Sequence, residues 1–481
     1  MVPGVTSTAG GARSAAMQCS TGIAVGLSAA DALPGKSELP ALWWSGCRWN
    51  ALLILPRPAI RPDEGRGLAE IGTGGIRSLA SRSGCFERRI AVSGPPCFTC
   101  GGSTRASEIT QEAFLADLNT GARPSGATTL LVLPGDGIGP EIVAATVEVL
   151  QAADRKFNLG LEYETADIGF ASLRAAGTTI ADAVVERAKA AAGVILGPVS
   201  HNEYPPVGEG GLNPSGELRR RLDLFANIRP ARSRPGLPAR CGRDIDLVIV
   251  RENTEGFYAD RSMHAGPGEF MPTPDLALSV RKITREGSTR IVEAAFSLAA
   301  RRRKRVTVVH KANVLRLSDG FFLACARQVA ERHGGIACEE RLVDAMAALL
   351  IRDPGQFDVI VTTNMFGDIL SDEASEIAGS LGIGASLNAG HRYAVAQAQH
   401  GSAPDIAGRD LANPSSLIES AAMLLSWLEE RGAGENFAAA GRCIATAVDA
   451  TIAVAAHRTR DLGGPLGTKA FTARVVAAMD R

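Results

Sequence analysis

Short runs that are apolar at every position or at all but one recur along the chain from position 128, and stretches with helical periodicity separate them. The runs span 130–133, 194–196, 247–250, 306–309 and 359–361. A strand that is apolar at every position is buried on both faces, as inside a parallel sheet covered by helices. Each interval is long enough for a crossover helix. The sequence therefore predicts an α/β fold with a mostly parallel sheet flanked by helices.

A glycine-rich turn, GDGIG at 135–139, follows the first apolar run. Pro140 suits the first turn of a helix, and Ile142, Val149 and Leu150 supply an apolar helix face. The pattern is not GxGxxG and no GK[ST] follows it, so neither a Rossmann fingerprint nor a P-loop is supported. The glycines allow the backbone to approach a phosphate, but a purely structural turn explains them equally well.

Composition narrows the class of protein. The chain has 481 residues, more than one hydrophobic core usually holds, so two or more domains are expected. Its formal net charge is zero, and no apolar run reaches the roughly 18 residues of a membrane span. Cysteines are sparse after residue 127, as in reduced, intracellular proteins. We expect a cytoplasmic protein with neither a nucleic-acid nor a membrane partner.

Residues 1–127 differ in amino-acid composition from the rest of the chain. They are rich in Gly, Ser, Ala, Pro and Arg, and they contain neither His nor Tyr. We interpret them as disordered, or as an extension translated from upstream of the true start. A transit peptide, which would place the protein in the mitochondrial matrix, is the alternative, although the segment is long for one.

Two aspartates, Asp368 and Asp372, follow an expected strand. If their segment is helical they lie on one face, where two carboxylates repel each other unless a cation lies between them. Oxygen ligands alone select a hard ion such as Mg²⁺ or Mn²⁺. A solvated helix face is the commoner explanation of such a pair taken by itself.

Three arginines and a lysine lie near the ends of apolar segments. Arg229 and Arg251 follow such segments, where an unpaired cation is costly, and Arg219 lies a little earlier. Guanidinium groups bind carboxylates through two parallel hydrogen bonds; structural ion pairs are the alternative. Lys311 ends a buried run, where desolvation can lower its basicity and suit it to proton transfer. A lysine that simply extends to solvent is the commoner case.

The polar segment HGSAPDIAG at 400–408 precedes a helix expected from Ser416. Asp405 within it can accept both hydroxyls of a ribose diol and repel a 2′-phosphate, which favours NAD over NADP. The alternative is a turn whose aspartate caps only backbone groups.

Together these segments resemble the isocitrate/isopropylmalate dehydrogenase family, which includes homoisocitrate dehydrogenase. The resemblance runs from about Leu130 to the C-terminus and rests on seven segments in the family's order. They are LPGDGIGPEI at 133–142, LDLFANIRP at 222–230, RENTEGFY at 251–258, HKANVLRLSDG at 310–320, NMFGDILSD at 364–372, HGSAPDIAG at 400–408 and DLGGPLGT at 461–468.

The resemblance implies a role for each matching position. Tyr258 and Lys311 are implied as the catalytic acid/base pair. The implied ligands of Mg²⁺ or Mn²⁺ are Asp344, Asp368 and Asp372. The implied substrate-binding residues are Arg219, Arg229, Arg251, Asn213, Ser215, Asn313 and Val314. The implied NAD-binding residues are His400, Gly401, Ser402, Ala403, Pro404, Asp405, Ile406 and Asn413.

The implied reaction is the NAD-dependent oxidative decarboxylation of a 3-substituted malate. Lys311 removes the hydroxyl proton, hydride passes to NAD, the β-keto acid loses CO₂ with metal assistance, and Tyr258 protonates the enolate. In this family the lysine and one metal-binding aspartate come from the other subunit, so a homodimer with shared active sites is implied. The implied fold is not a Rossmann domain: 128–226 plus 379–481 form a cofactor-binding domain, and 227–378 form a domain for substrate, metal and dimerisation.

The sequence departs from the family pattern at three places. Where isopropylmalate enzymes have leucines, NPSGE stands at 213–217. This polar segment favours an isocitrate-like substrate, while isopropylmalate, homoisocitrate, tartrate and malate stay open. The usual FEPVHG reads AQAQHG at 396–401, which alters the surroundings of the nicotinamide. Arg460 stands where NADP-dependent relatives have a phosphate-contacting tyrosine, although Asp405 still favours NAD.

Two other functions compete with the enzyme. A non-catalytic regulatory subunit of an isocitrate dehydrogenase would commonly lack a metal-binding or acid/base residue, and here all five implied ones are present. A nucleotide-binding module without chemistry would not need the three arginines. We therefore expect a catalytic chain.

Overall fold

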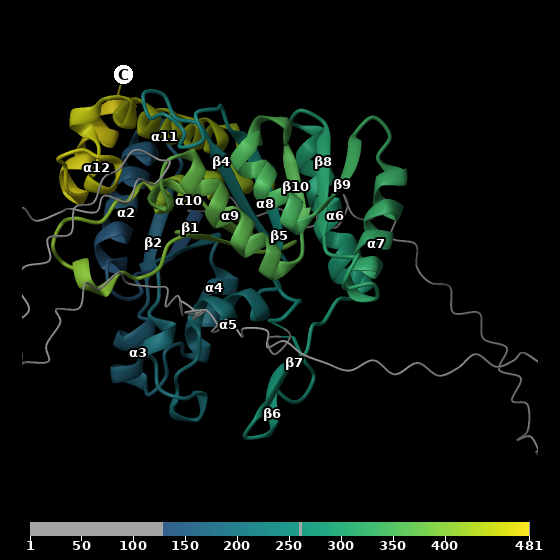
Figure 1. Cartoon of the computed structure of the whole chain (residues 1–481). Coiled ribbons are helices and arrows are strands. Elements are labelled where there is room, and N and C mark those ends of the chain that lie inside the picture. Colours follow the sequence, from purple (N-terminus) through teal and green to yellow (C-terminus); the bar gives the residue numbers. More distant parts are fainter. Residues whose placement is uncertain (1–127, 259–261, 481) are drawn as a thin grey trace, which may run out of the picture. The chain divides into compact units, whose positions relative to one another are not determined.

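The computed structural model describes residues 128–258 and 262–480, so the expectation for residues 1–127 lies outside it. Its main element is a ten-stranded sheet in the order β2-β1-β3-β12-β11-β4-β5-β10-β8-β9 (Figure 1). Its strands are β1 (Thr128–Leu133), β2 (Leu161–Thr165), β3 (Gly193–Leu196), β4 (Ala226–Arg232), β5 (Asp246–Glu252), β8 (Arg305–His310), β9 (Ala337–Leu342), β10 (Val359–Thr362), β11 (Leu387–Ala389) and β12 (Ala394–Gln397).

Most neighbouring strands in this sheet are parallel. The antiparallel pairs are β11 with β12, β11 with β4, and β4 with β5. The five apolar runs lie in β1, β3, β5, β8 and β10, each of which has a strand on both sides. The predicted fold, a mostly parallel sheet flanked by helices, is confirmed.

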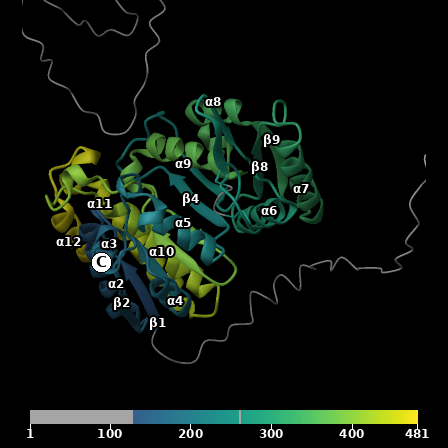
Figure 2. The same cartoon turned by 90° about the horizontal axis from the view of Figure 1, so that it is seen from below.

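Helices cover both faces of the sheet. They are α2 (Gly139–Phe157), α3 (Gly169–Ala176), α4 (Asp182–Ala190), α5 (Pro214–Arg221), α6 (Arg285–Ala300), α7 (Ser318–Arg332), α8 (Val343–Arg352), α9 (Asn364–Ala378), α10 (Ser415–Glu429), α11 (Glu435–Ala453) and α12 (Thr468–Met479). Figure 2 shows α6 and α7 beside β8 and β9, and α2, α11 and α12 at the other end of the sheet. The helix expected at Pro140 is α2, with Pro140 in its first turn.

Each apolar run contributes to two hydrophobic clusters because its side chains alternate between the two faces of the sheet. Leu130 and Val132 pack in one cluster with α2, α10 and α11, while Leu131 and Leu133 pack in another with α4. Two further clusters lie on the two faces around β5, one with α6 and α7 and one with α8 and α9. The first two clusters draw on 130–224 and 383–479 and the other two on 225–378. This separation supports the two-domain division, which stays a proposal.

A separate two-stranded arm is formed by β6 (Glu269–Thr273) and β7 (Leu276–Ser279) (Figure 1). Every residue of both strands is exposed, including the large apolar side chains of Phe270, Met271, Leu276 and Leu278. A lone hairpin with apolar faces is marginal in water, so this arm requires a covering surface. Among the described helices, none is long and apolar enough to cross a membrane.

Candidate active site

A cavity of about 230 Å³ brings together residues from distant parts of the sequence. The predicted site residues that line it are Asn213, Ser215, Arg219, Arg229, Arg251, Tyr258, Asp368, His400 and Gly401. They come from α5 and its N-cap, from β4, from β5 and the segment that follows it, from α9 and from the segment after β12. The predicted residues Lys311, Asn313, Val314 and Asp344 do not line it.

Strand pairing positions two of the arginines. In the antiparallel pair of β4 and β5, Asn227 lies directly opposite Arg251. Arg229 is two residues further along β4, so it projects from the same face of the sheet. Both guanidinium groups are buried, and burial together with the charge of Arg251 lowers the pKa of Arg229 to about 10. Buried cations this close together require anions beside them.

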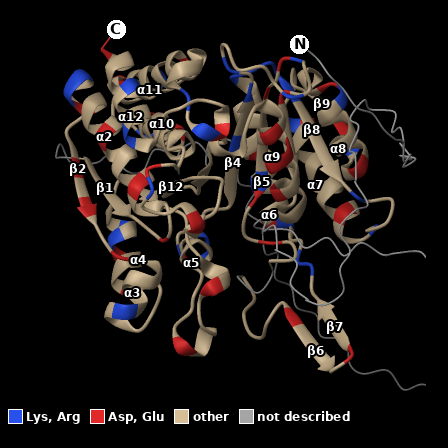
Figure 3. Ribbon diagram, turned by 60° about the vertical axis from the view of Figure 1, so that its left-hand side comes forward, with Lys and Arg blue, Asp and Glu red and all other residues tan. Residues whose placement is uncertain are grey.

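Helix α9, which packs over β4 and β5, supplies those anions (Figure 3). Asp368 accepts hydrogen bonds from Arg251 and, at 3.3 Å, from Arg229. The same Nη1 of Arg229 lies 3.2 Å from Asp372, so the two carboxylates do share one helix face. Burial acts to raise the pKa of Asp368, but the charges of Arg251, Arg229 and Arg219 outweigh it and the pKa is lowered. Burial raises the pKa of Asp372 in spite of Gln399 and Arg229.

A single chain brings together only some of the ligands that a hard cation such as Mg²⁺ or Mn²⁺ needs. Asp368 and Asp372 offer carboxylate oxygens, the ligands that Mg²⁺ and Mn²⁺ prefer. Among residues 128–258 and 262–480, no group of three or more His, Cys, Asp or Glu side chains is placed to hold a metal. Two of the three implied ligands are therefore adjacent, and the third, Asp344, lies elsewhere.

Tyr258 is held over the charged cluster. Its hydroxyl lies 3.4 Å from Oδ2 of Asp368, and the guanidinium of Arg251 lies 5.7 Å from the centre of its ring. The phenol therefore lies at the wall where the arginines and Asp368 meet, within reach of a ligand bound to them.

Lys311 forms an ion pair with Asp344. Its side chain is 26% exposed, so its position after a buried strand does not by itself desolvate it. Its backbone N–H donates to Asp319, which is fully buried and paired with Arg281. The neighbouring Asn313 is exposed, and Val314 is 66% exposed. This segment is firmly anchored, and its predicted site residues face solvent.

The predicted cofactor segment lies between β12 and α10. Ser402 is buried: its carbonyl accepts from Ile138 N at 2.8 Å and its hydroxyl bonds Ser200 at 2.7 Å. Gly137 has a φ of +58°, and a Cβ there would lie 2.0 Å from the Ser402 carbonyl. The glycine turn therefore permits this segment to dock, which is a structural reason for it. Burial lowers the pKa of His400, whose Nε2 is buried without a hydrogen-bond partner in the described residues.

The remaining predicted cofactor residues are divided between exposed and buried positions. Asp405 is exposed, and its side chain makes no hydrogen bond to the described residues. Ala403, Pro404 and Ile406 flank it in the same segment. Asn413 is buried: its Oδ1 accepts from Ser415 N at the start of α10, and its Nδ2 donates to Asp461. The Asn413 side chain thus fixes the helix start, and its contact with cofactor stays a prediction.

Sequence analysis missed two glutamines of the cavity. Gln397 accepts hydrogen bonds from Ser215 at 3.0 Å and Arg219 at 3.4 Å. Gln399 donates to Asp372 at 2.7 Å and accepts from Ser375. The signal was present in AQAQHG, where both residues depart from the family's usual letters. Spacing alone gave no reason to place them against the arginines and aspartates.

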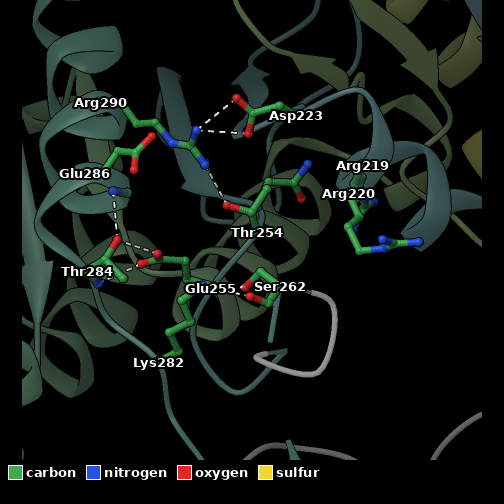
Figure 4. A pocket seen from close by; sticks show the side chains of 12 residues that line it. Arg219, Arg220, Asp223, Thr254, Glu255, Ser262, Lys282, Thr284, Glu286 and Arg290 are labelled. Atoms are coloured by element: carbon green, nitrogen blue, oxygen red, sulfur yellow. Dashed lines mark hydrogen bonds and ion pairs between the residues drawn. The ribbon is translucent and has the colours of Figure 1, made fainter. Parts of the chain in front are cut away.

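A second cavity, of about 360 Å³, shares Arg219 with the first (Figure 4). Several of its charged groups already have partners in the chain. Arg290 bonds both oxygens of Asp223, at 2.9 and 3.0 Å, and the hydroxyl of Thr254. Glu255 accepts from the backbone and side chain of Thr284. The smaller cavity is the better candidate for a ligand site, because nine of the predicted site residues line it and only one of them, Arg219, lines the larger cavity.

The fold and the first cavity define a class of α/β protein with a small ligand site rich in arginine and aspartate. Residues 129–478 match the family model for isocitrate/isopropylmalate dehydrogenase. The 3-isopropylmalate dehydrogenase of Saccharolobus solfataricus is 38% identical over 333 residues, 69% of this chain and 94% of that relative. The isocitrate/homoisocitrate dehydrogenase of Thermus thermophilus is 40% identical over 355 residues, 73% of this chain and 99% of that relative.

A solved structure agrees with these relatives. The crystal structure of isocitrate dehydrogenase from Methylococcus capsulatus matches with a TM-score of 0.66 and 38% identity, over 73% of this chain and 99% of that one. The chain belongs to the isocitrate/isopropylmalate dehydrogenase family. Membership supports a decarboxylating dehydrogenase that acts on a 3-carboxy-2-hydroxy acid, in a family that generally uses NAD(P) and a divalent metal.

Proposed function

We propose that this protein catalyses the NAD- and Mg²⁺- or Mn²⁺-dependent oxidative decarboxylation of a 3-substituted malate, with an isocitrate-like substrate favoured. One observation carries the proposal: Arg219, Arg229 and Arg251 surround a single cavity that also holds Tyr258 and Asp368. Three cations suit a substrate with several carboxylates, because guanidinium groups bind carboxylates in a bidentate manner.

The polar wall of the cavity supports the choice of substrate. Ser215 lies at the predicted side-group position, and its hydroxyl faces Gln397 rather than an apolar side chain. An alkyl substituent would offer this polar wall no further hydrogen bond while displacing the water that could form one, which is costly in a buried site. A substituent that carries oxygen avoids this cost.

We assign acid/base chemistry to two side chains: Lys311, which lies outside the cavity of its own chain, and Tyr258, which lines that cavity. Lys311 removes the proton of the substrate hydroxyl as its carbon is oxidised, and Tyr258 delivers a proton to the carbon that has lost CO₂. Arg229 and Arg251 orient the substrate carboxylates against α9. Asp368 and Asp372, with the partner subunit's Asp344, would hold a divalent cation, which would supply Lewis-acid stabilisation of negative charge on oxygen, and the bound nicotinamide cofactor would supply the hydride acceptor.

A homodimer completes this arrangement. Lys311 and Asp344 do not line the cavity of their own chain, and Asn313 and Val314, which follow Lys311, are exposed. Exposed apolar side chains lie beside them: Val314 and Leu317 follow β8, and Ile351 is on α8. The exposed arm of β6 and β7 needs cover as well. A second copy of the chain would bury these surfaces and bring Lys311 to the partner's Tyr258.

The preference for NAD rests on Asp405. Its carboxylate is exposed in the segment after β12, and no side-chain hydrogen bond to the described residues occupies it. It can therefore accept both hydroxyls of an adenosine ribose and repel a phosphate at the 2′ position. No observation favours a regulatory, non-catalytic role.

A substrate screen tests the proposed function. The full chain is incubated with NAD and either Mg²⁺ or Mn²⁺, and NADH absorbance is followed with isocitrate, 3-isopropylmalate, homoisocitrate, malate or tartrate. We expect the highest kcat/KM with isocitrate and loss of activity when a chelator removes the metal. Absence of oxidation with every one of these acids would contradict the proposal.

A further inference from the structure

A chain of buried side-chain amides begins at Arg229. The guanidinium has only donors, so the atom 2.7 Å from its Nε is the carbonyl oxygen of Asn227. This contact fixes the orientation of the Asn227 amide, and its Nδ2 then donates to Oδ1 of Asn388 at 2.6 Å. Asn227 and Asn388 are almost completely buried.

Asn388 is oriented from a second side as well. Asn253, also fully buried, donates its Nδ2 to the same Oδ1 at 3.0 Å. Since two donors meet at that oxygen, the opposite end of the Asn388 amide is its Nδ2. That group donates to Oε1 of Gln397 at 3.2 Å. The identity of each oxygen and nitrogen therefore follows from the network and from Arg229, which can only donate.

Gln397 is the end of this chain of amides. Its Oε1 accepts from Asn388, from Ser215 and from Arg219, a second guanidinium that can only donate. Reversal of the amide would place its N–H groups against these donors. The Nε2 makes no hydrogen bond to the described residues and is not among the buried unpaired atoms. Because Gln397 lines the cavity, its two N–H donors remain available there.

We propose that Gln397 is a specificity-determining residue whose Nε2 donates a hydrogen bond to an oxygen of the C3 substituent of the substrate. The inference rests on the proposed function. Its geometric basis is that Ser215 and Arg219, both assigned to the substrate, hold the Gln397 carbonyl and so place the amide nitrogen beside the same ligand. The class of substituent selected is a carboxylate or another group with an accepting oxygen, in preference to an alkyl group.

The variant Gln397→Glu tests the proposed hydrogen bond, because the side chains of Glu and Gln have almost the same shape. One carboxylate oxygen still accepts from Asn388, Ser215 and Arg219, while the other presents a negative charge where Nε2 stood. We expect kcat/KM for isocitrate to fall by about 10²-fold, because the Nε2 donor is lost and the new carboxylate repels the carboxylate of the substrate. The value for 3-isopropylmalate should change by less than about threefold, because its alkyl group makes no hydrogen bond there.

Two further variants make the result specific. Gln397→Met removes the donor without adding charge and should lower the isocitrate to isopropylmalate ratio of kcat/KM by about tenfold. Gln328→Glu changes an exposed glutamine on α7 and should leave both values unchanged. Calorimetric titration of each acid into the metal-loaded chain without NAD should show the same loss of isocitrate affinity, and thermal melting reports whether each variant is folded.

The outcomes separate the two proposals. If the unaltered protein oxidises none of the five acids of the substrate screen, the proposed function is overturned and this inference with it. If the unaltered protein oxidises isocitrate but Gln397→Glu lowers kcat/KM for both acids equally, or for neither, the assignment of Gln397 is wrong while the proposed function stands. An unaltered protein that prefers 3-isopropylmalate to isocitrate also overturns the assignment.

Discussion

Lys311 pairs with Asp344 outside the cavity in which Tyr258 meets Asp368. The parallel pairing of β8 and β9 explains why Lys311 and Asp344 lie together. His310 pairs with Leu342 at the ends of these strands, and Lys311 and Asp344 follow them closely in sequence. The hydrogen bond from Lys311 lowers the pKa of Asp344. The proposed general base and the proposed metal ligand are thus paired on neighbouring strands at the edge of the sheet, where the proposed second subunit would receive them.

Subunit mixing tests this arrangement. Lys311→Met and Tyr258→Phe should each be almost inactive as pure homodimers, because acid/base groups typically contribute about 10²–10⁴-fold to rate. After the two proteins are dissociated together and allowed to reassociate, activity should return to roughly a quarter of the native value, since half of the dimers are mixed and each has one intact site. If Lys311 serves the cavity of its own chain, mixing restores nothing.

The two acid/base residues should act at different steps. Lys311→Met should abolish oxidation of the hydroxy acid but retain some decarboxylation of the β-keto acid supplied directly with metal. Tyr258→Phe should keep more of the redox step and lose more of the enolate protonation. Both half-reactions are followed on each variant, one by NADH absorbance and one by CO₂ release. Equal loss of both half-reactions in both variants contradicts the division of roles.

Cofactor choice should depend on Asp405. Asp405→Lys replaces the carboxylate proposed to bind the ribose diol by a cation that attracts a 2′-phosphate. We expect kcat/KM with NAD to fall and that with NADP to rise, while KM for the hydroxy acid changes little. Glu331→Lys, an exposed acid on α7, controls for the change of charge. A native preference for NADP would show that Arg460 is the better guide to the cofactor.

Gly367 on α9 allows Arg251 to lie close to the helix. A Cβ at Gly367 would lie 2.6 Å from Cγ of Arg251, so Gly367→Ala should displace the guanidinium from Asp368 and raise substrate KM. About tenfold is expected if one charged hydrogen bond to the substrate is lost. Gly320→Ala on α7 is the matched control, because nothing lies within 4 Å of its added Cβ. An unchanged KM in Gly367→Ala would show that Arg251 does not hold the substrate.

The first 127 residues should be dispensable for catalysis. From Thr128 the described chain forms its own sheet, with β1 paired on both sides by β2 and β3. A protein that begins near Thr128 should keep the melting temperature and turnover of the full chain, measured by calorimetry and NADH absorbance. A substantial loss of either would mean that the removed segment stabilises the enzyme.

The strands that sequence predicted and those it missed differ for a physical reason. β1 and β5 are covered on both faces, so their central residues, 130–133 and 247–250, are all apolar and the run can be recognised in the sequence. β9 is an edge strand with Glu339, Glu340 and Arg341 at its centre, and β11 is three residues long with a buried asparagine. Their polarity and brevity hide them, because their stability comes from neighbours distant in sequence.

The sequence likewise determined only part of the chemistry of the site. The residue types and their local spacing indicated three arginines for carboxylates and two aspartates on one helix face, since these depend on the charge and periodicity of short segments. Only the tertiary structure decided that Lys311 and Asp344 lie outside their own cavity and that Gln397 has its amide nitrogen free within it. Those two results arise from strand register and from hydrogen bonds that link residues up to 182 positions apart, as between Ser215 and Gln397, and no local pattern contains them.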